Sequence, residues 1–128
     1  MKSIKQTYFI KSSVGSVWSA LVDPEKIDDW GAGSVKMDDR EGSKFSLWGG
    51  DIWGKNKEVV PNKKLVQEWY GGDWDKPSIV TFSLKKKDGG TQVDLTHEDL
   101  PDNEIKDHEK GWKDYYLGPL KDFVEKNN

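Results

Sequence analysis

The period of the hydrophobic pattern changes along the chain, and this change limits the possible folds more than any other feature. Between residues 34 and 98, short runs of alternating apolar and polar side chains are separated by turn residues, which is typical of antiparallel strands joined by hairpins. After Pro101 the apolar residues recur at helical spacing along one side of a long segment. A sheet of this kind must bury one face, and the C-terminal helix is the only large element available to cover it.

The N-terminal part predicts one more strand and two short helices. Residues 2–11 alternate like a strand, and Ser13 can cap a helix that Asp23 and Pro24 end. Pro24 then starts a second short helix that runs to about Trp30. We interpret residues 34–98 as six further strands, and we expect Pro119 to kink the terminal helix. The predicted fold class is α+β, with one domain over residues 1–128 whose curved antiparallel sheet wraps around the long helix.

The composition predicts an aromatic core. Only 34% of the residues are hydrophobic, but the chain holds 7 Trp and 4 Tyr, whose large rings each bury much apolar surface. The sequence contains no Cys, which excludes disulfides and zinc–thiolate sites. No run of apolar residues is long enough for a signal peptide or a membrane span. We therefore expect a cytoplasmic protein without a membrane partner.

The charge pattern argues against a nucleic-acid partner. The net charge is −3, and Arg40 is the only arginine among 20 basic residues. Bidentate recognition of phosphates and guanine edges depends on the arginine guanidinium. The one basic run, residues 85–87, is followed at once by Asp88-Gly89-Gly90, which is typical of a solvated hairpin tip.

No catalytic or metal-binding set stands out. The chain has only two His, and no nucleophile–base arrangement or metal-ligand spacing surrounds them. The consecutive His97, Glu98 and Asp99 lie on an expected strand, where neighbouring side chains point to opposite faces and cannot converge on one ion. We therefore expect neither an enzyme nor a cofactor.

A set of motifs resembles one known family in order along nearly the whole chain. The motifs are Gly42-x-Lys44-Phe45, Gly50–Gly54, Glu58-Val59-Val60-Pro61, Trp69 at a strand end, and Gly111-Trp112-x-x-Tyr115-Tyr116. They are similar to the activator-of-heat-shock-protein-ATPase homologue family, in particular to the C-terminal domain of the co-chaperone that stimulates the ninety-kilodalton heat-shock chaperone. This family belongs to the START-like superfamily that also includes the birch-pollen allergen, and the resemblance implies a helix-grip fold.

The resemblance also implies functions. It suggests a non-catalytic module with a heat-shock chaperone as its partner. The other domain of the co-chaperone, which carries the strongest ATPase-stimulating motif, has no counterpart here, so we expect binding with little stimulation. The superfamily also includes lipid carriers, hormone receptors and polyketide cyclases, and a fold alone does not fix activity. The alternatives are therefore a carrier or sensor of a small apolar ligand and, last, a cyclase-like enzyme.

Strand alternation turns several polar side chains toward the helix. With Lys55 and Lys57 outside, Asn56 and Glu58 face inward, and so do Gln67 and His97 on two other strands. A buried polar group without a partner costs about 1–3 kcal/mol. Either these groups bond one another, with a bulge re-aiming some of them, or they line a wet cavity that a ligand could enter.

Large rings would form the walls of such a cavity. Trp69 and Phe82 are the inward aromatic side chains of two strands, and Trp112 and Tyr116 lie on the apolar side of the terminal helix. Gly54 adds no bulk beneath the helix. The predicted ligand-binding residues are Asn56, Glu58, Gln67, Trp69, Phe82, His97, Trp112 and Tyr116.

Two further tryptophans are candidates for partner binding. If Gly49-Gly50 is a two-residue hairpin turn, Leu47 pairs with Ile52, and both Trp48 and Trp53 lie on the outer face of the sheet. Exposed aromatic patches tend to mark partner sites. The alternatives are that the rings staple neighbouring strands together, or that the loop carrying Trp74 covers them.

Overall fold

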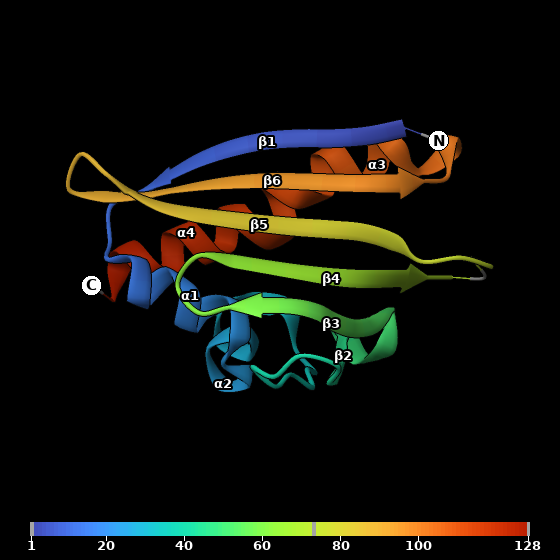
Figure 1. Ribbon diagram of the computed structural model, residues 1–128, viewed down its shortest axis with the longest axis horizontal. Coiled ribbons are helices and arrows are strands. Elements are labelled where there is room, and N and C mark those ends of the chain that lie inside the picture. Colours follow the sequence, from blue (N-terminus) through green and yellow to red (C-terminus); the bar gives the residue numbers. More distant parts are fainter. Residues whose placement is uncertain (1, 73, 128) are drawn as a thin grey trace.

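A six-stranded antiparallel sheet forms one layer of the molecule. The computed structural model describes residues 2–72 and 74–127. The strands lie in the order β1-β6-β5-β4-β3-β2, so that the first strand pairs with the last (Figure 1). Their bounds are β1 Lys2–Ile10, β2 Lys44–Leu47, β3 Ile52–Val60, β4 Lys64–Gly71, β5 Ser78–Lys87 and β6 Gly90–Leu100.

Two short helices follow β1, as the sequence predicts. α1 (Val14–Val22) begins at Ser13, whose side chain accepts a hydrogen bond from the Ser16 amide. Asp23 ends α1 and caps α2 (Pro24–Ile27), since its carboxylate accepts a hydrogen bond from the Glu25 amide. An irregular turn (Asp28–Ala32) continues α2 and includes Trp30, the expected end of this helix.

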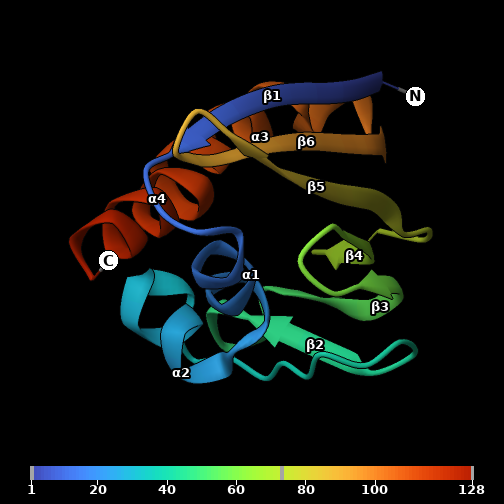
Figure 2. The ribbon, with the colours of Figure 1, turned by 60° about the vertical axis from the view of Figure 1, so that its left-hand side comes forward.

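The C-terminal helix is built from three consecutive segments that lie on the concave side of the sheet (Figure 2). α3 (Ile105–Gly111) follows a short turn (Asp102–Glu104), η4 (Trp112–Tyr116) is a single π-helical turn, and α4 (Leu117–Lys126) completes the element. The expected break is present. It falls at Tyr116, whose φ and ψ are −121° and −81°, just before Pro119. Because Pro119 has no N–H and its ring would contact the Tyr115 carbonyl, the regular helix is interrupted at this point.

One expected strand is absent from the described residues. After α2 five strands follow instead of six, because the segment before β2 contributes only an isolated bridge between Lys36 and Ser46. The turn that follows it is held by its own side chains, among them the ion pair of Arg40 with Asp38 at 2.7 Å. A chain that turns so soon after one bridge cannot continue a ladder.

The expected aromatic core is confirmed. Trp18, Trp30, Trp69, Trp112 and Tyr116 are all buried. Tyr116 lies at the centre of this group, with its ring centroid 4.7 Å from that of Trp30 and 4.8 Å from that of Trp112. The π-helical turn therefore brings two of its rings into the middle of the molecule, between the sheet and the irregular turn after α2.

Candidate functional site

A β-bulge in β3 divides the polar residues that were expected to face the helix. Asn56 pairs with Gln67, whereas Glu58 pairs with Val66, so Lys57 is the extra residue. The bulge turns Val59 inward and leaves the Glu58 carboxylate at the surface, 3.6 Å from Lys64 Nζ. The expectation that Glu58 faces the helix is therefore wrong, because one inserted residue exchanges the two faces of a strand.

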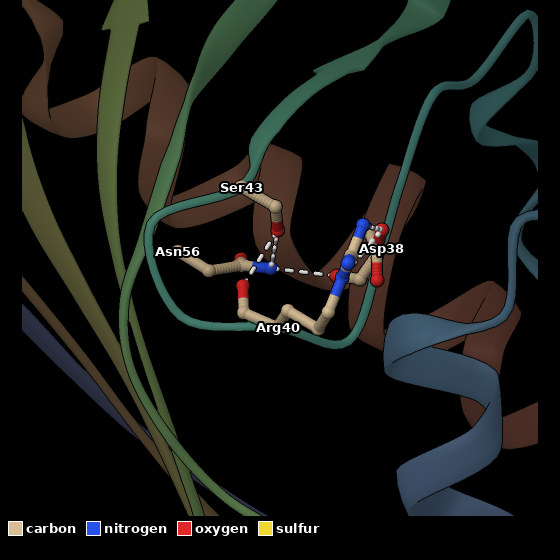
Figure 3. A network of polar contacts seen from close by, with 4 residues as sticks. All are labelled: Asp38, Arg40, Ser43 and Asn56. Carbon is tan, nitrogen blue, oxygen red and sulfur yellow. Dashed lines mark hydrogen bonds and ion pairs between the residues drawn. The ribbon is translucent and has the colours of Figure 1, made fainter.

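Asn56 and Gln67 are fully buried and bond each other. Gln67 Nε2 donates to Asn56 Oδ1 at 2.9 Å, and Gln67 Oε1 accepts from the Trp69 indole at 2.8 Å. Asn56 Nδ2 donates in turn to the Asp38 carbonyl and to Ser43 Oγ (Figure 3). The chain of bonds ties β3 and β4 to the turn before β2. Of the two alternatives for these side chains, a mutually bonded network is the one present.

A second buried network surrounds His97 on β6. Trp112 Nε1 donates to His97 Nδ1 at 3.1 Å, and His97 Nε2 lies 2.7 Å from Ser78 Oγ. Because the indole N–H can only donate, Nδ1 must accept, and the neutral ring carries its proton on Nε2. Ser78 Oγ in turn donates to the Trp69 carbonyl at 3.1 Å. The network links the terminal helix to β4, β5 and β6.

This arrangement does not suit nucleophilic catalysis. The Nε2 proton makes His97 a donor toward Ser78, whereas a general base would have to accept the serine proton. Both side chains are fully buried. Burial, with a smaller effect of nearby His108, lowers the pKa of His97 to about 3, so the ring stays neutral.

A cavity of about 340 Å³ lies between the terminal helix and one end of the sheet. Its walls are mostly aromatic and come from α3, η4, β3, β4 and the turn before β3. The lining residues are Trp48, Ile52, Trp69, Asp107, His108, Gly111, Trp112, Tyr115 and Tyr116. A volume of about 300–1,000 Å³ with predominantly apolar walls and few polar groups is usual for small-molecule sites.

Three of the four predicted wall residues line this cavity, and Phe82 does not. Trp69, Trp112 and Tyr116 border it. The buried side chain of Phe82 stacks on Tyr116, with the two ring centroids 5.6 Å apart. Gly54 also serves another purpose, since a Cβ there would collide with the Glu68 backbone carbonyl of the adjacent strand. This glycine permits close strand approach and does not open space beneath the helix.

The cavity's other wall residues were not predicted from the sequence. Trp48 and Ile52 were assigned through a hairpin register, while Gly111 and Tyr115 appeared only within a family motif. The three-residue interval from His108 to Gly111 and the four-residue interval from His108 to Trp112 place these positions on one helical face. The periodicity could therefore have indicated a shared wall. Nothing in the sequence could have shown that the wall faces open space.

The hydroxyl of Tyr116 is the unusual polar group of the site. Tyr116 is only 1% exposed, and its OH has no hydrogen-bond partner within residues 2–72 and 74–127. An unsatisfied buried hydroxyl costs about 1–3 kcal/mol. Burial also raises the pKa of Tyr116 well above its usual value, so the group remains a protonated donor. Tyr116 therefore borders the cavity with its ring, whereas its hydroxyl is enclosed in the core.

His108 and Asp107 bring polarity to the rim. His108 is half-buried, and its Nε2 lies 3.8 Å from Glu104 Oε2. Burial lowers the pKa of His108 despite the opposing effect of Glu104 and Asp107. Its ring packs against the indole of Trp74, with the two ring centroids 5.6 Å apart. The loop after β4 therefore lies beside this rim.

Trp48 and Trp53 do not form a common patch. The expected pairing of Leu47 with Ile52 is confirmed, but Trp48 begins a tight turn (Trp48–Gly50) with φ of +51°. This backbone turns its ring inward, where Nε1 donates to the Gly31 carbonyl at 3.2 Å and the ring meets Tyr116 edge-on at 6.3 Å. The expectation of an outward Trp48 is therefore wrong.

Trp53 does lie on the outer face, 39% exposed. Its ring stacks on that of Tyr70, the residue directly opposite on β4, with centroids 5.9 Å apart and planes 8° apart. The cross-strand staple that the sequence left as an alternative is therefore present. The Trp53 ring nevertheless remains partly exposed on the outer face.

Two other kinds of site are absent from the described part of the chain. Within residues 2–72 and 74–127, no three His, Cys, Asp or Glu side chains are grouped so as to hold a metal ion. No helix of this part has the length and apolar character needed to cross a membrane.

Comparison with known families identifies the chain. The model of the family described as "Activator of Hsp90 ATPase homolog 1-like protein" matches residues 11–125. The chain belongs to this family. The family resemblance expected from the motifs is thus confirmed. A curated member, the activator of 90 kDa heat shock protein ATPase homolog of Dictyostelium discoideum, is 31% identical over 124 residues, which are 94% of this chain but 32% of that protein. The chain spans about a third of the length of the curated relatives it matches.

Solved structures of similar proteins have the same fold. The crystal structure of an HSP90 activator from Plasmodium falciparum superposes with a TM-score of 0.89 at 24% identity and covers 97% of this chain and 96% of that one. The crystal structure of CalU16 from Micromonospora echinospora gives a TM-score of 0.80 at 29% identity, covering 98% of this chain and 76% of that one. The helix-grip fold expected for this family is therefore confirmed.

Proposed function

We propose that this family member is a non-catalytic binding module whose partner is a heat-shock chaperone of the 90 kDa class. The observation that carries the proposal is the family match over residues 11–125, together with the 31% identity to a curated ATPase activator of that chaperone. The similarity reaches about a third of the activator's length. We therefore propose that this module binds the chaperone. Without the regions that make up the rest of the activator's length, it should have only a small effect on the chaperone's ATP turnover.

The outer face of the sheet is our candidate for the contact surface. Trp53 is 39% exposed there, and its stacking on Tyr70 holds the ring in a fixed orientation. Rigid, exposed aromatic side chains are enriched among the residues that contribute most to protein–protein binding. The neighbouring pair on the same two strands, Lys55 and Glu68, lies 3.9 Å apart and supplies a polar rim.

Titration against a purified 90 kDa chaperone tests the proposal. We expect measurable binding by calorimetry, with a change in ATP turnover of less than about twofold, since the relative named as an activator is about three times as long as this chain. No detectable binding would remove the chaperone from the proposal. Strong stimulation by this chain alone would instead contradict the division between binding and activation.

A variant pair tests the surface separately. Trp53→Ser should weaken binding at least about fivefold, since a hot-spot aromatic contributes more than about 1 kcal/mol. Val60→Ser is the matched control, because Val60 lies on the same strand with a similar exposure of 37% but away from the stacked pair. Equal effects of the two changes would show that the chaperone binds elsewhere.

The proposal of a non-catalytic role has its own support. The buried Ser78–His97 pair is protonated in the direction opposite to that needed for base catalysis. Two curated relatives with which the chain is aligned, from Dictyostelium discoideum and Homo sapiens, are named as activators of another protein's ATPase. We therefore rank a cyclase-like reaction below the binding role.

A further inference from the structure

Two hairpin turns lie side by side at one end of the sheet and bring lysine side chains together there. The β5–β6 turn follows Lys87, and the β3–β4 turn precedes Lys64. A backbone hydrogen bond joins the two hairpins, since the Leu84 amide donates to the Lys63 carbonyl at 2.8 Å. We call the basic residues of this end the lysine cluster, which consists of Lys63, Lys64, Lys85, Lys86 and Lys87. The sequence shows only the run of three, because the other two belong to a different hairpin.

The positive charge of the lysine cluster is largely uncompensated. Lys64 lies 3.6 Å from the Glu58 carboxylate. Within residues 2–72 and 74–127, no carboxylate pairs with the other four members, and all four are exposed. The whole chain carries a net charge of −3, so this end is basic on a molecule that is acidic overall. A concentration of like charge on one surface attracts a partner of opposite charge.

The backbone beneath the lysine cluster is well defined. Asp88 and Gly89 form a two-residue turn with φ of +48° and +80°, left-handed values that match the twist of a tight hairpin. Figure 1 shows this hairpin projecting beyond the neighbouring strands. Lys85 and Lys87 lie on the same face of β5, about 6.6 Å apart along the strand. Every second residue of an extended peptide has the same spacing, so a peptide can match both lysines at once.

The position of Asp88 favours a narrow partner over a flat one. Asp88 is exposed in the turn itself, at the projecting end of the hairpin. A flat anionic surface such as a membrane would meet this carboxylate first, and like charges repel. A single extended chain can instead lie along Lys85 and Lys87, behind the turn. Arg40, the only arginine, is not part of the cluster, and this disfavours nucleic acid because bidentate phosphate contacts need a guanidinium.

We propose that the lysine cluster binds an extended acidic segment of another protein, with Glu or Asp at alternate positions along β5. Single exposed ion pairs are weak, so binding uses several of them together and is sensitive to salt. This surface is separate from the proposed chaperone contact, because Trp53 lies at the other end of β3, opposite Tyr70. The proposal therefore goes beyond the chaperone role and does not depend on it.

Two labelled peptides test the requirement for charge. One alternates glutamate with serine, and the other has glutamine in place of every glutamate. We expect the glutamate peptide to bind at about 0.05 M salt in a fluorescence anisotropy titration, and to bind at least about fivefold more weakly at about 0.3 M salt. The glutamine peptide should not bind. Equal binding of the two peptides, or no binding of the glutamate peptide at millimolar protein, would overturn the proposal.

A variant of the β5–β6 hairpin tests the location. The cluster variant combines Lys85→Gln, Lys86→Gln and Lys87→Gln, and it should weaken binding of the glutamate peptide about tenfold, the combined effect of several exposed ion pairs. Because the three side chains are exposed, the variant should fold, which circular dichroism melting verifies. Lys63→Gln on the other hairpin should weaken the same peptide about twofold.

A second variant controls for net charge. It combines Lys106→Gln, Lys110→Gln and Lys113→Gln, three exposed lysines of the terminal helix, and so removes the same charge elsewhere. It should change the affinity for the glutamate peptide less than about twofold. If it weakens the peptide as much as the cluster variant does, the attraction is a property of the whole molecule and the proposed site is wrong.

Two further measurements separate this surface from other partners. Vesicles containing phosphatidylserine should bind the parent protein no more tightly than uncharged vesicles. Strong binding that the cluster variant abolishes would make the surface a membrane contact and overturn the assignment to a peptide. Trp53→Ser should bind the glutamate peptide normally, and a loss of binding would show that the peptide uses the chaperone surface instead.

Discussion

At the scale of single residues, two neighbouring tryptophans show how the backbone decides exposure. Trp48 and Trp53 are separated by one turn, yet the positive φ of Trp48 sends its ring to the core side, while Trp53 stays on the outer face. Trp48 also bonds the Gly31 carbonyl and so connects the turn to the segment after α2. The same residue type therefore contributes to stability at one position and is available for contacts at the other.

Serine substitutions should separate these two roles. We expect Trp53→Ser to lower the free energy of unfolding by less than about 1 kcal/mol, because an exposed staple of this kind contributes only about 0.2–1 kcal/mol. Trp48→Ser should cost about 2 kcal/mol or more, since it removes packing against Tyr116 and a hydrogen bond. Urea unfolding of both variants measures the difference, and similar costs would contradict the two orientations.

The burial of neutral His97 should make the free energy of unfolding depend on pH. Its pKa is about 3 in the folded protein and near 6.5 when the chain is unfolded, so the unfolded state takes up the proton first. The contribution of the neutral ring is fully present above pH 6.5 and is lost as the pH falls toward 3. The total loss over this window is on the order of 5 kcal/mol.

Urea unfolding at a series of pH values measures this loss. His97→Gln should be less stable than the parent at pH 8, because Trp112 loses a well-placed acceptor. Its stability should however fall less steeply than the parent's between pH 6.5 and 4, since the titrating ring is gone. His108→Gln is the comparison for the other histidine, which is less buried. Parallel pH profiles of parent and His97→Gln would overturn the assignment.

At the scale of elements, the π-helical turn η4 determines which side chains the terminal helix presents to the sheet. The Leu117 amide bonds the Trp112 carbonyl five residues back, which adds a residue to the turn and brings both Trp112 and Tyr116 inward. Gly118 makes this geometry possible, because any Cβ at that position would collide with the Lys113 backbone carbonyl.

Two glycine-to-alanine changes test the importance of this turn. Alanine normally favours a helix over glycine by about 1 kcal/mol. Gly15→Ala in α1, where an added Cβ meets nothing, should therefore raise the free energy of unfolding by up to about 1 kcal/mol. Gly118→Ala should lower it by more than about 1 kcal/mol despite the better propensity, because the backbone must shift. If thermal melting showed that both changes stabilise, the close approach at η4 would not exist in solution.

At the scale of the whole molecule, the two ends of the sequence hold each other in place. β1 pairs along its length with β6, so that Lys5 lies opposite Thr96, and the Lys11 amide donates to the Glu125 carboxylate at 2.9 Å. The buried aromatic rings then connect the sheet, the terminal helix and the segment after α2 in one core. Such a structure has few parts that could be stable alone.

We therefore expect a single cooperative unfolding transition and slow folding. Tryptophan fluorescence should report the aromatic core and far-ultraviolet circular dichroism the sheet, and both should give the same urea midpoint. Because the pairing of β1 with β6 must close a long loop, refolding should take roughly milliseconds to seconds. Separate midpoints for the two signals would show that the sheet and the helical part unfold independently.

The sequence by itself determined most of the elements and the faces of most of them, although it predicted one strand more before β2 than the structure contains. Alternation placed Leu65, Gln67 and Trp69 correctly inside, and helical periodicity placed Trp112 and Tyr116 on the buried side, because both patterns report local backbone geometry directly. Only the tertiary structure decided the rest. The bulge at Lys57 turned Glu58 outward, and the positive φ at Trp48 turned the Trp48 ring inward. The buried amides of Asn56 and Gln67 bond each other and do not line a cavity. A bulge or a left-handed turn depends on contacts with distant segments of the chain. A cavity is space that several elements together fail to fill. No local sequence pattern therefore encodes any of these three features.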